Sequence, residues 1–215
     1  MVYLTSDWHL YHDNIMKYVS TRNTHKTVDD YMWDLIYQMR MLRPEDTLVF
    51  MGDLALSPRK SKLGIKAILD TIPGEKHFLR GNHDAWVSDA DLLSMGFKSV
   101  RDYILLQTPK DFCDADDCGE AAQTLICHYP FDQPKPKPQP GSTYEPHGYL
   151  WDLFYENPNI KTIYHGHIHA GKCKKQDGIK RINCSVDALK GEFRVVPITG
   201  ALGIQLAKEL NSKEE

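Results

Sequence analysis

Five apolar runs in this chain end in the same kind of polar residue, and this repetition constrains the fold more than any other feature. The polar endings are SDWH (6–9), GDL (52–54), GNHD (81–84), HYP (128–130) and HGHIH (165–169). Glycine and asparagine are typical of turns because they accept unusual backbone angles. A turn does not also need aspartate and histidine. Each ending alone is compatible with plain turn chemistry, but five of them together indicate a site.

The alternation of apolar runs with helical patterns predicts an α/β protein. In the first half, strands are expected at 2–5, at 47–51 and within 76–84, with helices after Thr27, at 57–69 and after Ser88. Thr27 has the position of a helix N-cap, followed by an acidic first turn. Strands that alternate with helices form βαβ units on a parallel sheet.

The second half has a different pattern but no convincing domain boundary. Strands are expected at 97–107, 122–127 and 160–169 and within 180–189 and 192–196, with a helix at 149–157. A proline-rich stretch from 130 onward favours extended backbone over a packed element. The whole chain, 1–215, is therefore predicted to be one domain. Its last residues, 209–215, are expected to fray.

Composition and charge exclude several classes of function. No run approaches the roughly 18 apolar residues that cross a bilayer, and the N-terminus lacks the pattern of a signal peptide. The five cysteines form no CxxC pair, which is typical of reduced thiols. We therefore expect a cytoplasmic protein. The formal net charge of -3 argues against a broad electrostatic grip on nucleic acid.

The polar endings carry the donors of a metal site. Loops at the carboxyl ends of parallel strands gather at one edge of a sheet. Because side chains alternate along a strand, Asp7 and His9 are expected to point the same way, as are His167 and His169. Aspartate, asparagine and histidine suit divalent ions such as Mn²⁺, Fe²⁺, Co²⁺ or Zn²⁺, whereas the absence of cysteine argues against a closed structural zinc site. Seven such side chains suit two ions that share a carboxylate and hold a hydroxide between them.

The order Asp-x-His, Gly-Asp, Gly-Asn-His-Asp, His, Gly-His-x-His, from Asp7 to His169, resembles that of the calcineurin-like metallophosphoesterases. The stretches TSDWHLYHDNI, EDTLVFMGDLAL and INCSVDAL are similar to the small single-domain bacterial and phage branch of that superfamily. The resemblance implies a four-layer α/β fold, an α+β sandwich. In it, two mixed β-sheets pack together and are flanked by helices.

The resemblance also implies a role for each polar residue. Asp7, His9 and His169 would hold one metal, Asn82, His128 and His167 would hold the other, and Asp53 would bridge them. The metals would be two divalent ions, with Mn²⁺ expected first and Fe²⁺, Co²⁺, Zn²⁺ or Ni²⁺ as alternatives. His83 would act at the leaving-group oxygen, as general acid or as electrostatic stabiliser. Asp84 would hydrogen-bond His83 and raise its basicity.

Other polar residues near these endings are candidates for contact with a substrate phosphate. His12, Arg22 and Arg80 are predicted to bind it, with ordinary loop solvation as the alternative for each. His165 is either a core residue or a support for the ligands. The segment 130–158, a proline-rich loop plus a helix, is longer than the link expected in this branch. It is interpreted as a surface loop, with a lid over the pocket or a partner-binding motif as the alternatives.

The expected reaction is hydrolysis of a small phosphoester by in-line attack of a hydroxide that bridges the metals. The stretch GDLALSP lacks the Asp-Arg pair of protein serine/threonine phosphatases, and the chain is too short for the DNA-repair nucleases. A phosphodiester is favoured over a phosphomonoester, with a nucleotide or cyclic nucleotide as one option; nucleic acid and membrane partners are not expected. The alternative function is a non-catalytic metal-binding scaffold of the same fold, because fold does not imply function.

Overall fold

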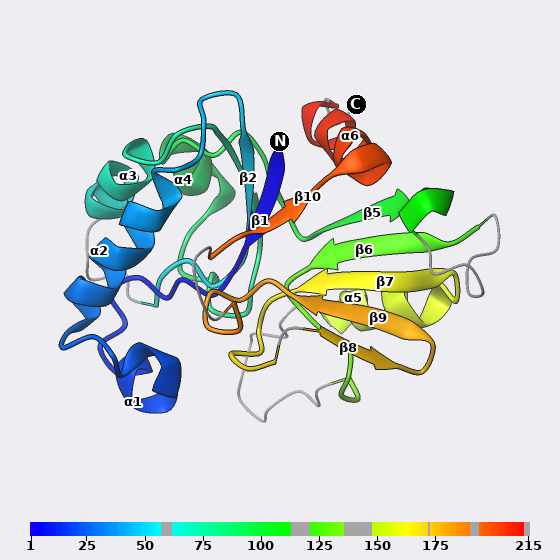
Figure 1. The fold of residues 1–215 in the computed structure, drawn as a ribbon, viewed down its shortest axis with the longest axis horizontal. Helices are drawn as coiled ribbons and strands as arrows, with labels where there is room; N and C mark the ends of the chain where they lie inside the picture. The colour runs from blue at the N-terminus through cyan, green and yellow to red at the C-terminus, as the bar shows by residue number, and fades with distance from the viewer. Residues whose placement is uncertain (57–61, 113–120, 136–147, 172, 190–193, 213–215) are drawn as a thin grey trace.

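The protein consists of two five-stranded sheets that pack face to face, with helices on the outer faces (Figure 1). The computed structural model describes residues 1–56, 62–112, 121–135, 148–171, 173–189 and 194–212. In those residues the layers run helix, sheet, sheet, helix. This arrangement confirms the predicted fold class.

The first sheet has the strand order β10-β1-β2-β3-β4. Its strands are β1 (Val2–Thr5), β2 (Thr47–Met51), β3 (Glu75–Leu79), β4 (Val100–Arg101) and β10 (Val196–Ile198). Strands β1 to β4 are parallel and β10 is antiparallel to β1. Helices α1 (Ile15–Tyr18), α2 (Val28–Met39), α3 (Lys62–Asp70) and α4 (Asp89–Ser94) lie in the connections. This half therefore follows the predicted βαβ pattern.

The second sheet has the order β5-β6-β7-β9-β8. Its strands are β5 (Tyr103–Gln107), β6 (Gln123–Cys127), β7 (Ile160–His165), β8 (Cys173–Gln176) and β9 (Ile179–Asn183). Strands β6, β7 and β9 are parallel, and the two edge strands are antiparallel to their neighbours. Helix α5 (Gly148–Glu156) connects β6 to β7, and α6 (Gly200–Asn211) ends the described chain.

Both faces of the central strands are buried, which explains why their sequences are continuously apolar. In β2, Leu48 and Phe50 pack with residues of α2, α3 and α4, whereas Val49 and Met51 pack with residues of the second sheet. Leu202 and Leu206 of α6 join the core between the sheets. The outer face of the second sheet packs against α5. The core thus holds the carboxyl ends of both sets of parallel strands in place.

The predicted helix starts are confirmed by reciprocal hydrogen bonds. The Thr27 hydroxyl accepts from the Asp30 N–H at 3.1 Å, and the Asp30 carboxylate accepts from the Thr27 N–H at 3.1 Å. Ser88 and Asp91 form the same arrangement at α4. Such a capping box satisfies donors that the first helical turn leaves free.

Several predicted boundaries are wrong. The expected strand at 97–107 is two strands, one in each sheet, because the chain crosses between the sheets at Asp102. The last strand lies at Val196–Ile198 rather than 192–196. The chain does not fray from 209, because α6 continues to Asn211 and buries Leu210 at 4% exposure.

Some predictions fall outside the described residues, namely the first part of the helix expected at 57–69 and the middle of the segment 130–158. Among the helices that are described, none has both the length and the apolar character needed to cross a membrane. The cytoplasmic location stays a prediction.

Candidate metal centre

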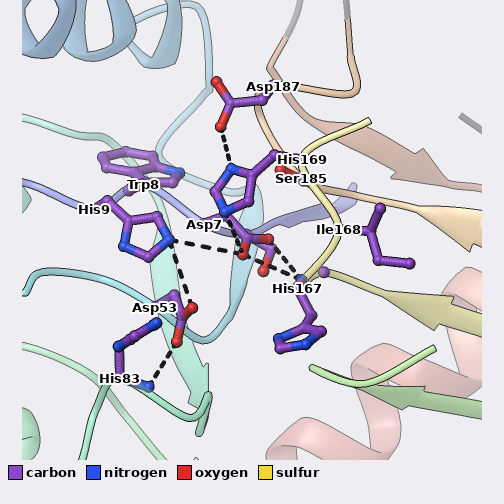
Figure 2. Close-up of polar contacts among 12 residues, drawn as sticks. Asp7, Trp8, His9, Asp53, His83, His167, Ile168, His169, Ser185 and Asp187 are labelled. Atoms are coloured by element: carbon purple, nitrogen blue, oxygen red, sulfur yellow. Dashed lines mark hydrogen bonds and ion pairs between the residues drawn. The ribbon is translucent and has the colours of Figure 1, made fainter. Parts of the chain in front are cut away.

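The five polar strand endings meet at one place, where the carboxyl ends of β1, β2 and β3 face those of β6 and β7. The two sheets are joined there by an isolated bridge between Ser6 and Ser185. Figure 2 shows His9, Asp53 and His169 gathered around Asp7. Strands that are far apart in sequence therefore deliver their polar ends to a common site, as the sequence predicts.

Asp7, His9 and His169 form the first donor group. The Asp7 Oδ1 atom lies 3.8 Å from His169 Nε2 and 4.0 Å from His9 Nε2, and one donor atom from each residue lies within 4.8 Å of the others. His9 is 2% exposed, and neither of its ring nitrogens has a hydrogen-bond partner among the described residues. Buried polar atoms are normally satisfied, so an imidazole without such a partner that faces two carboxylates fits a ligand of a cation.

Asn82, His128 and His167 form the second donor group. Asn82 Oδ1 lies 2.9 Å from His128 Nε2 and 2.9 Å from His167 Nδ1, and the two nitrogens are 3.3 Å apart. Ligands that each lie about 2.0–2.1 Å from one ion are separated from one another by about 3 Å. The other nitrogen of His128, Nδ1, faces the Met51 carbonyl at 2.8 Å, which leaves Nε2 free for a ligand.

Asp53 lies between the two groups. Its Oδ2 atom is 3.5 Å from His9 Nε2 and 3.5 Å from His128 Nε2, one histidine from each group. Burial and the negative charge of Asp7 raise the pKa of Asp53 well above its ordinary value. A buried carboxylate in this position needs positive charge beside it. The geometry fits a ligand that two ions share.

Comparison with known proteins identifies the family. The model of the family described as calcineurin-like phosphoesterase matches residues 1–171. The chain belongs to the calcineurin-like phosphoesterase family. Within that family, members typically bind divalent metals. This agrees with the clustering in this chain of Asp7 with His9 and His169, and of Asp7 with Asp53 and His128.

The chain is similar to a protein from Methanocaldococcus jannaschii and to one from Aquifex aeolicus. Uncharacterized protein MJ1445 of Methanocaldococcus jannaschii is 31% identical over 143 residues, which cover 63% of this chain and 77% of that protein. The crystal structure of AQ665 from Aquifex aeolicus, a protein of unknown function, has a TM-score of 0.57 and 24% identity over 87% of this chain and 90% of that chain. The second likeness supports the fold alone.

Four of the residues in the candidate metal centre have left-handed backbone. The φ angles are 62° at Asp7, 46° at His9, 56° at Asp53 and 66° at His167. Asp7 and His9 reach the same site, as predicted, but the predicted reason is wrong. Strand alternation does not align Asp7 with His9, or His167 with His169, because β1 ends at Thr5 and β7 at His165. Such angles cost on the order of 1–3 kcal/mol each and are typical of functional sites.

Hydrogen bonds hold these strained turns together. The His9 N–H donates to the Asp53 carbonyl at 2.9 Å, and the Asp7 N–H donates to the Gly52 carbonyl at 3.1 Å. The His167 N–H donates to the Asp7 carboxylate at 3.0 Å. A Cβ atom at position 81 would lie 2.7 Å from the Asp53 nitrogen, so only glycine allows this close approach.

Asp84 does not have the predicted role. Its buried carboxylate accepts hydrogen bonds from the backbone N–H groups of Gly81 at 2.8 Å, Asp53 at 2.8 Å and Leu54 at 3.1 Å. Burial and the charge of Asp53 raise the pKa of Asp84 to about 7, while the backbone donors favour the ionised form. The carboxylate therefore ties the turn after β3 to the turn after β2 and is not directed at His83.

His83 lies at the open side of the centre. Its ring centroid is 5.5 Å from that of His9, and its backbone N–H donates to Asp53 Oδ1 at 2.9 Å. Partial desolvation by the surrounding residues and the neighbouring His128 lower the pKa of His83. The side chain is exposed and is bonded to none of the described residues, which leaves its nitrogens available to a substrate. His12 is also nearby, with its ring 5.7 Å from that of His9.

Neither arginine is free to bind phosphate, and the prediction for Arg22 is wrong. Arg22 is fully buried; its Nη2 donates to Asp187 Oδ2 at 2.7 Å and to the Asp7 carbonyl at 2.7 Å. Arg80 donates to the carbonyls of Asp84 at 3.2 Å and Val87 at 3.0 Å and pairs with Asp89. Both guanidinium groups hold loops of the centre in position.

Asp187 is the main residue that the sequence reasoning missed. It is fully buried, and its Oδ2 lies 2.6 Å from His169 Nδ1 (Figure 2). A carboxylate in this position fixes the ring and leaves Nε2 to face the centre. A signal was present, because β9 is a sixth strand with a polar ending, INCSVD. His165, by contrast, is buried and bonded to the Gly166 carbonyl, so it supports the turn.

Proposed function

We propose that this chain is a dinuclear metal-dependent phosphoesterase that hydrolyses a small phosphoester, with diesters preferred to monoesters. The observation that carries the proposal is the position of Asp53, 3.5 Å from one histidine of each donor group. Asp7, His9 and His169 would hold one cation, and Asn82, His128 and His167 the other. Nitrogen and oxygen donors without sulfur suit Mn²⁺ among the divalent ions.

When bound, two such cations supply an activated water at neutral pH and offset the charge of a phosphate. The chain's own residues do the rest. Asp53 and Asp7 keep the donor groups together, and Asp84 fixes the turns from which Asp53 and Asn82 project. His83 stands at the open side, where its ring donates a hydrogen bond or a proton to the leaving-group oxygen.

The surroundings of the centre favour a monoanionic diester. Arg22 is buried against Asp187, and Arg80 is bonded within its own loop, so neither offers a free charge to a dianionic monoester. Lys135 pairs with Asp152 at 2.9 Å. Beside Asn82 and His167 there is an apolar pocket in which a second ester group can lie. A small molecule with one phosphodiester group is the substrate class that fits both features.

The proposal is tested by hydrolysis of bis-p-nitrophenyl phosphate and of p-nitrophenyl phosphate, first with metal-stripped protein and then with Mn²⁺ restored. We expect turnover only with metal, and faster turnover of the diester. Metal binding without hydrolysis of either ester would favour a non-catalytic scaffold. Failure of the folded protein to bind Mn²⁺ would overturn the proposal altogether.

A further inference from the structure

An apolar cavity of about 260 Å³ opens beside the second donor group. Its lining comes from residues 129–134, Trp151, Asn82 and His167. Asn82 and His167 belong to both the cavity and the proposed metal centre. A molecule whose phosphate lies at the centre therefore has this cavity as its immediate neighbour.

Aromatic rings form the wall of this cavity. The Tyr129 ring lies 5.5 Å from that of His167 and 4.8 Å from that of Trp151, and Phe131 meets Trp151 edge-on at 4.9 Å. Tyr129, Phe131 and Trp151 are each 5% exposed or less. These distances are typical of aromatic pairs, and such surfaces take up a further ring by the same contacts.

The wall is held rigidly from two sides. Arg181 of β9 is 3% exposed and donates from Nε to the Pro130 carbonyl at 2.7 Å and from Nη2 to the Phe131 carbonyl at 3.3 Å. On the other side, Trp151 Nε1 of α5 donates to the Gln133 carbonyl at 3.3 Å. Phe131 has a φ of 49°, which is rare for a bulky residue and persists only where the surroundings impose it. The wall of the pocket is therefore held by contacts within the chain itself.

The charge of the lining selects against a second anionic group. Among the described residues that line the cavity there is no lysine or arginine, and Asp132 adds a carboxylate. A diphosphate or a carboxylated substituent would meet this carboxylate without a compensating cation. An uncharged ring meets apolar surface instead, with Asn82 and Gln133 as the nearby amides. The cavity volume of about 260 Å³ is near the lower end of the range for small-molecule pockets, so the cavity has room for one ring system.

From these features we infer that the pocket of Tyr129, Phe131 and Trp151 binds an uncharged aromatic ester group of the phosphoester substrate. The inference rests on the proposed function, because it places the phosphate of the same molecule at the metal centre. It also gives part of the segment 130–158 a role, because residues 130–134 and Trp151 line the specificity pocket.

The test compares two phosphonates, phenylphosphonate and methylphosphonate, as ligands of the Mn²⁺-loaded protein. Binding is measured by titration calorimetry and by inhibition of methyl p-nitrophenyl phosphate hydrolysis. We expect phenylphosphonate to bind about ten-fold more tightly or better, since burial of one aromatic ring is worth at least that factor. Both ligands present the same phosphonate group to the metals. The ratio of their dissociation constants therefore measures the contribution of the pocket alone.

Two variants and two controls locate the effect. Trp151→Ala removes part of the aromatic wall, and Gln133→Trp fills the cavity from its exposed rim. Each variant is expected to bring the ratio of the two affinities close to one. Gln133 is exposed, so this second variant does not depend on repacking of the core. Trp151→Phe should retain most of the preference. Tyr155→Ala, at an exposed site on the same helix, should leave the ratio unchanged.

The outcomes separate the inference from the proposed function. Hydrolysis of methyl p-nitrophenyl phosphate, together with equal affinity for the two phosphonates, would overturn the inference and leave the phosphoesterase intact. A preference for phenylphosphonate that survives both Trp151→Ala and Gln133→Trp would also overturn it, because the ring would then bind elsewhere. Absence of both hydrolysis and phosphonate binding would remove the proposed function, and the inference with it.

Discussion

The two halves of the proposed metal centre have different surroundings. Behind Asp7, His9 and His169 lie buried charges: Asp187 bonds His169, and Arg22 bonds Asp187 and the Asp7 carbonyl. Behind Asn82, His128 and His167 lie the Met51 carbonyl and the aromatic rings of Tyr129 and Trp151. One half is thus anchored by charge inside the protein, and the other opens onto an apolar pocket.

This difference indicates that the two halves have different functions. A buried carboxylate that orients a histidine makes a donor group rigid and selective for a cation. A donor group beside an apolar pocket is placed to receive the organic part of a substrate. We infer that the first half chiefly holds its metal, whereas the second half holds its metal and contacts the substrate.

The largest effect is expected from Asp53→Ala, because this residue faces both halves. Loss of the shared carboxylate should remove several kcal/mol of transition-state stabilisation, a fall of about 10³-fold or more in kcat/KM. Steady-state hydrolysis of bis-p-nitrophenyl phosphate measures it. Asp70→Ala, at a carboxylate that pairs with Lys66 on the surface of α3, is the matched control and should retain full activity.

His83→Ala should reduce kcat by about 10²-fold or more, the usual contribution of a positioned acid or hydrogen-bond donor. Metal content should stay unchanged, because His83 belongs to neither donor group. Activity and metal content are measured on the same sample by kinetics and elemental analysis. Loss of metal from this variant would show that His83 is instead part of one half of the centre.

Asp187→Asn and Asn82→Ala should affect opposite halves. Asp187→Asn is expected to weaken binding of one Mn²⁺ by about 10–100-fold, the usual effect of losing a carboxylate that orients a histidine ligand. Asn82→Ala should weaken binding of the other Mn²⁺ ion. Isothermal titration with Mn²⁺ resolves the two steps. If each variant weakened both ions equally, the two halves would act as one unit.

The smallest effect is a difference in protonation between the halves of the metal-free protein. Burial opposes protonation of His169, but the hydrogen bond to Asp187 and the charges of Asp7 and Asp187 raise its pKa above the ordinary 6.5. Burial and the neighbouring His128 lower the pKa of His167 to about 4. NMR titration of the imidazole signals should therefore show His169 gaining its proton at a higher pH than His167.

The two histidines should also affect stability in opposite directions. His169 holds its proton more tightly in the folded state, so its contribution is complete below pH 6.5 and is lost as the pH rises through its folded pKa. For His167, the unfolded chain binds more protons between pH 6.5 and about 4, so acidification destabilises the fold. Protonation of His167 before His169 would contradict the contrast between the halves.

The sequence predicted which residues meet but not how the backbone brings them together. Apolar runs with polar endings were sufficient to place Asp7, Asp53, Asn82 and His128 at a common edge, since hydrophobic pattern determines where strands end. The left-handed angles at Asp7, His9 and His167 could not be predicted, because they are imposed by hydrogen bonds between distant loops. Strand alternation predicted correctly that Asp7 and His9 share a site, but both residues lie beyond the end of β1, so alternation is not the cause.

The sequence does not reveal the partners of polar residues that lie outside a recognisable motif. Arg22 was predicted to face substrate, yet it is buried against Asp187, a partner 165 positions away in the chain. Nothing local marks such a pair, because it depends on the packing of the segment after β1 against the segment after β9. The pocket of Tyr129, Phe131 and Trp151 was hidden for the same reason, since a loop and a helix form it together.

We expect two cations to bind among the seven donors and to share Asp53. Anomalous scattering from crystals of the protein grown with Mn²⁺ would locate them. Two peaks are expected, one among Asp7, His9 and His169 and one among Asn82, His128 and His167, with the Asp53 carboxylate between them. A single peak at this centre, or none, would contradict this expectation.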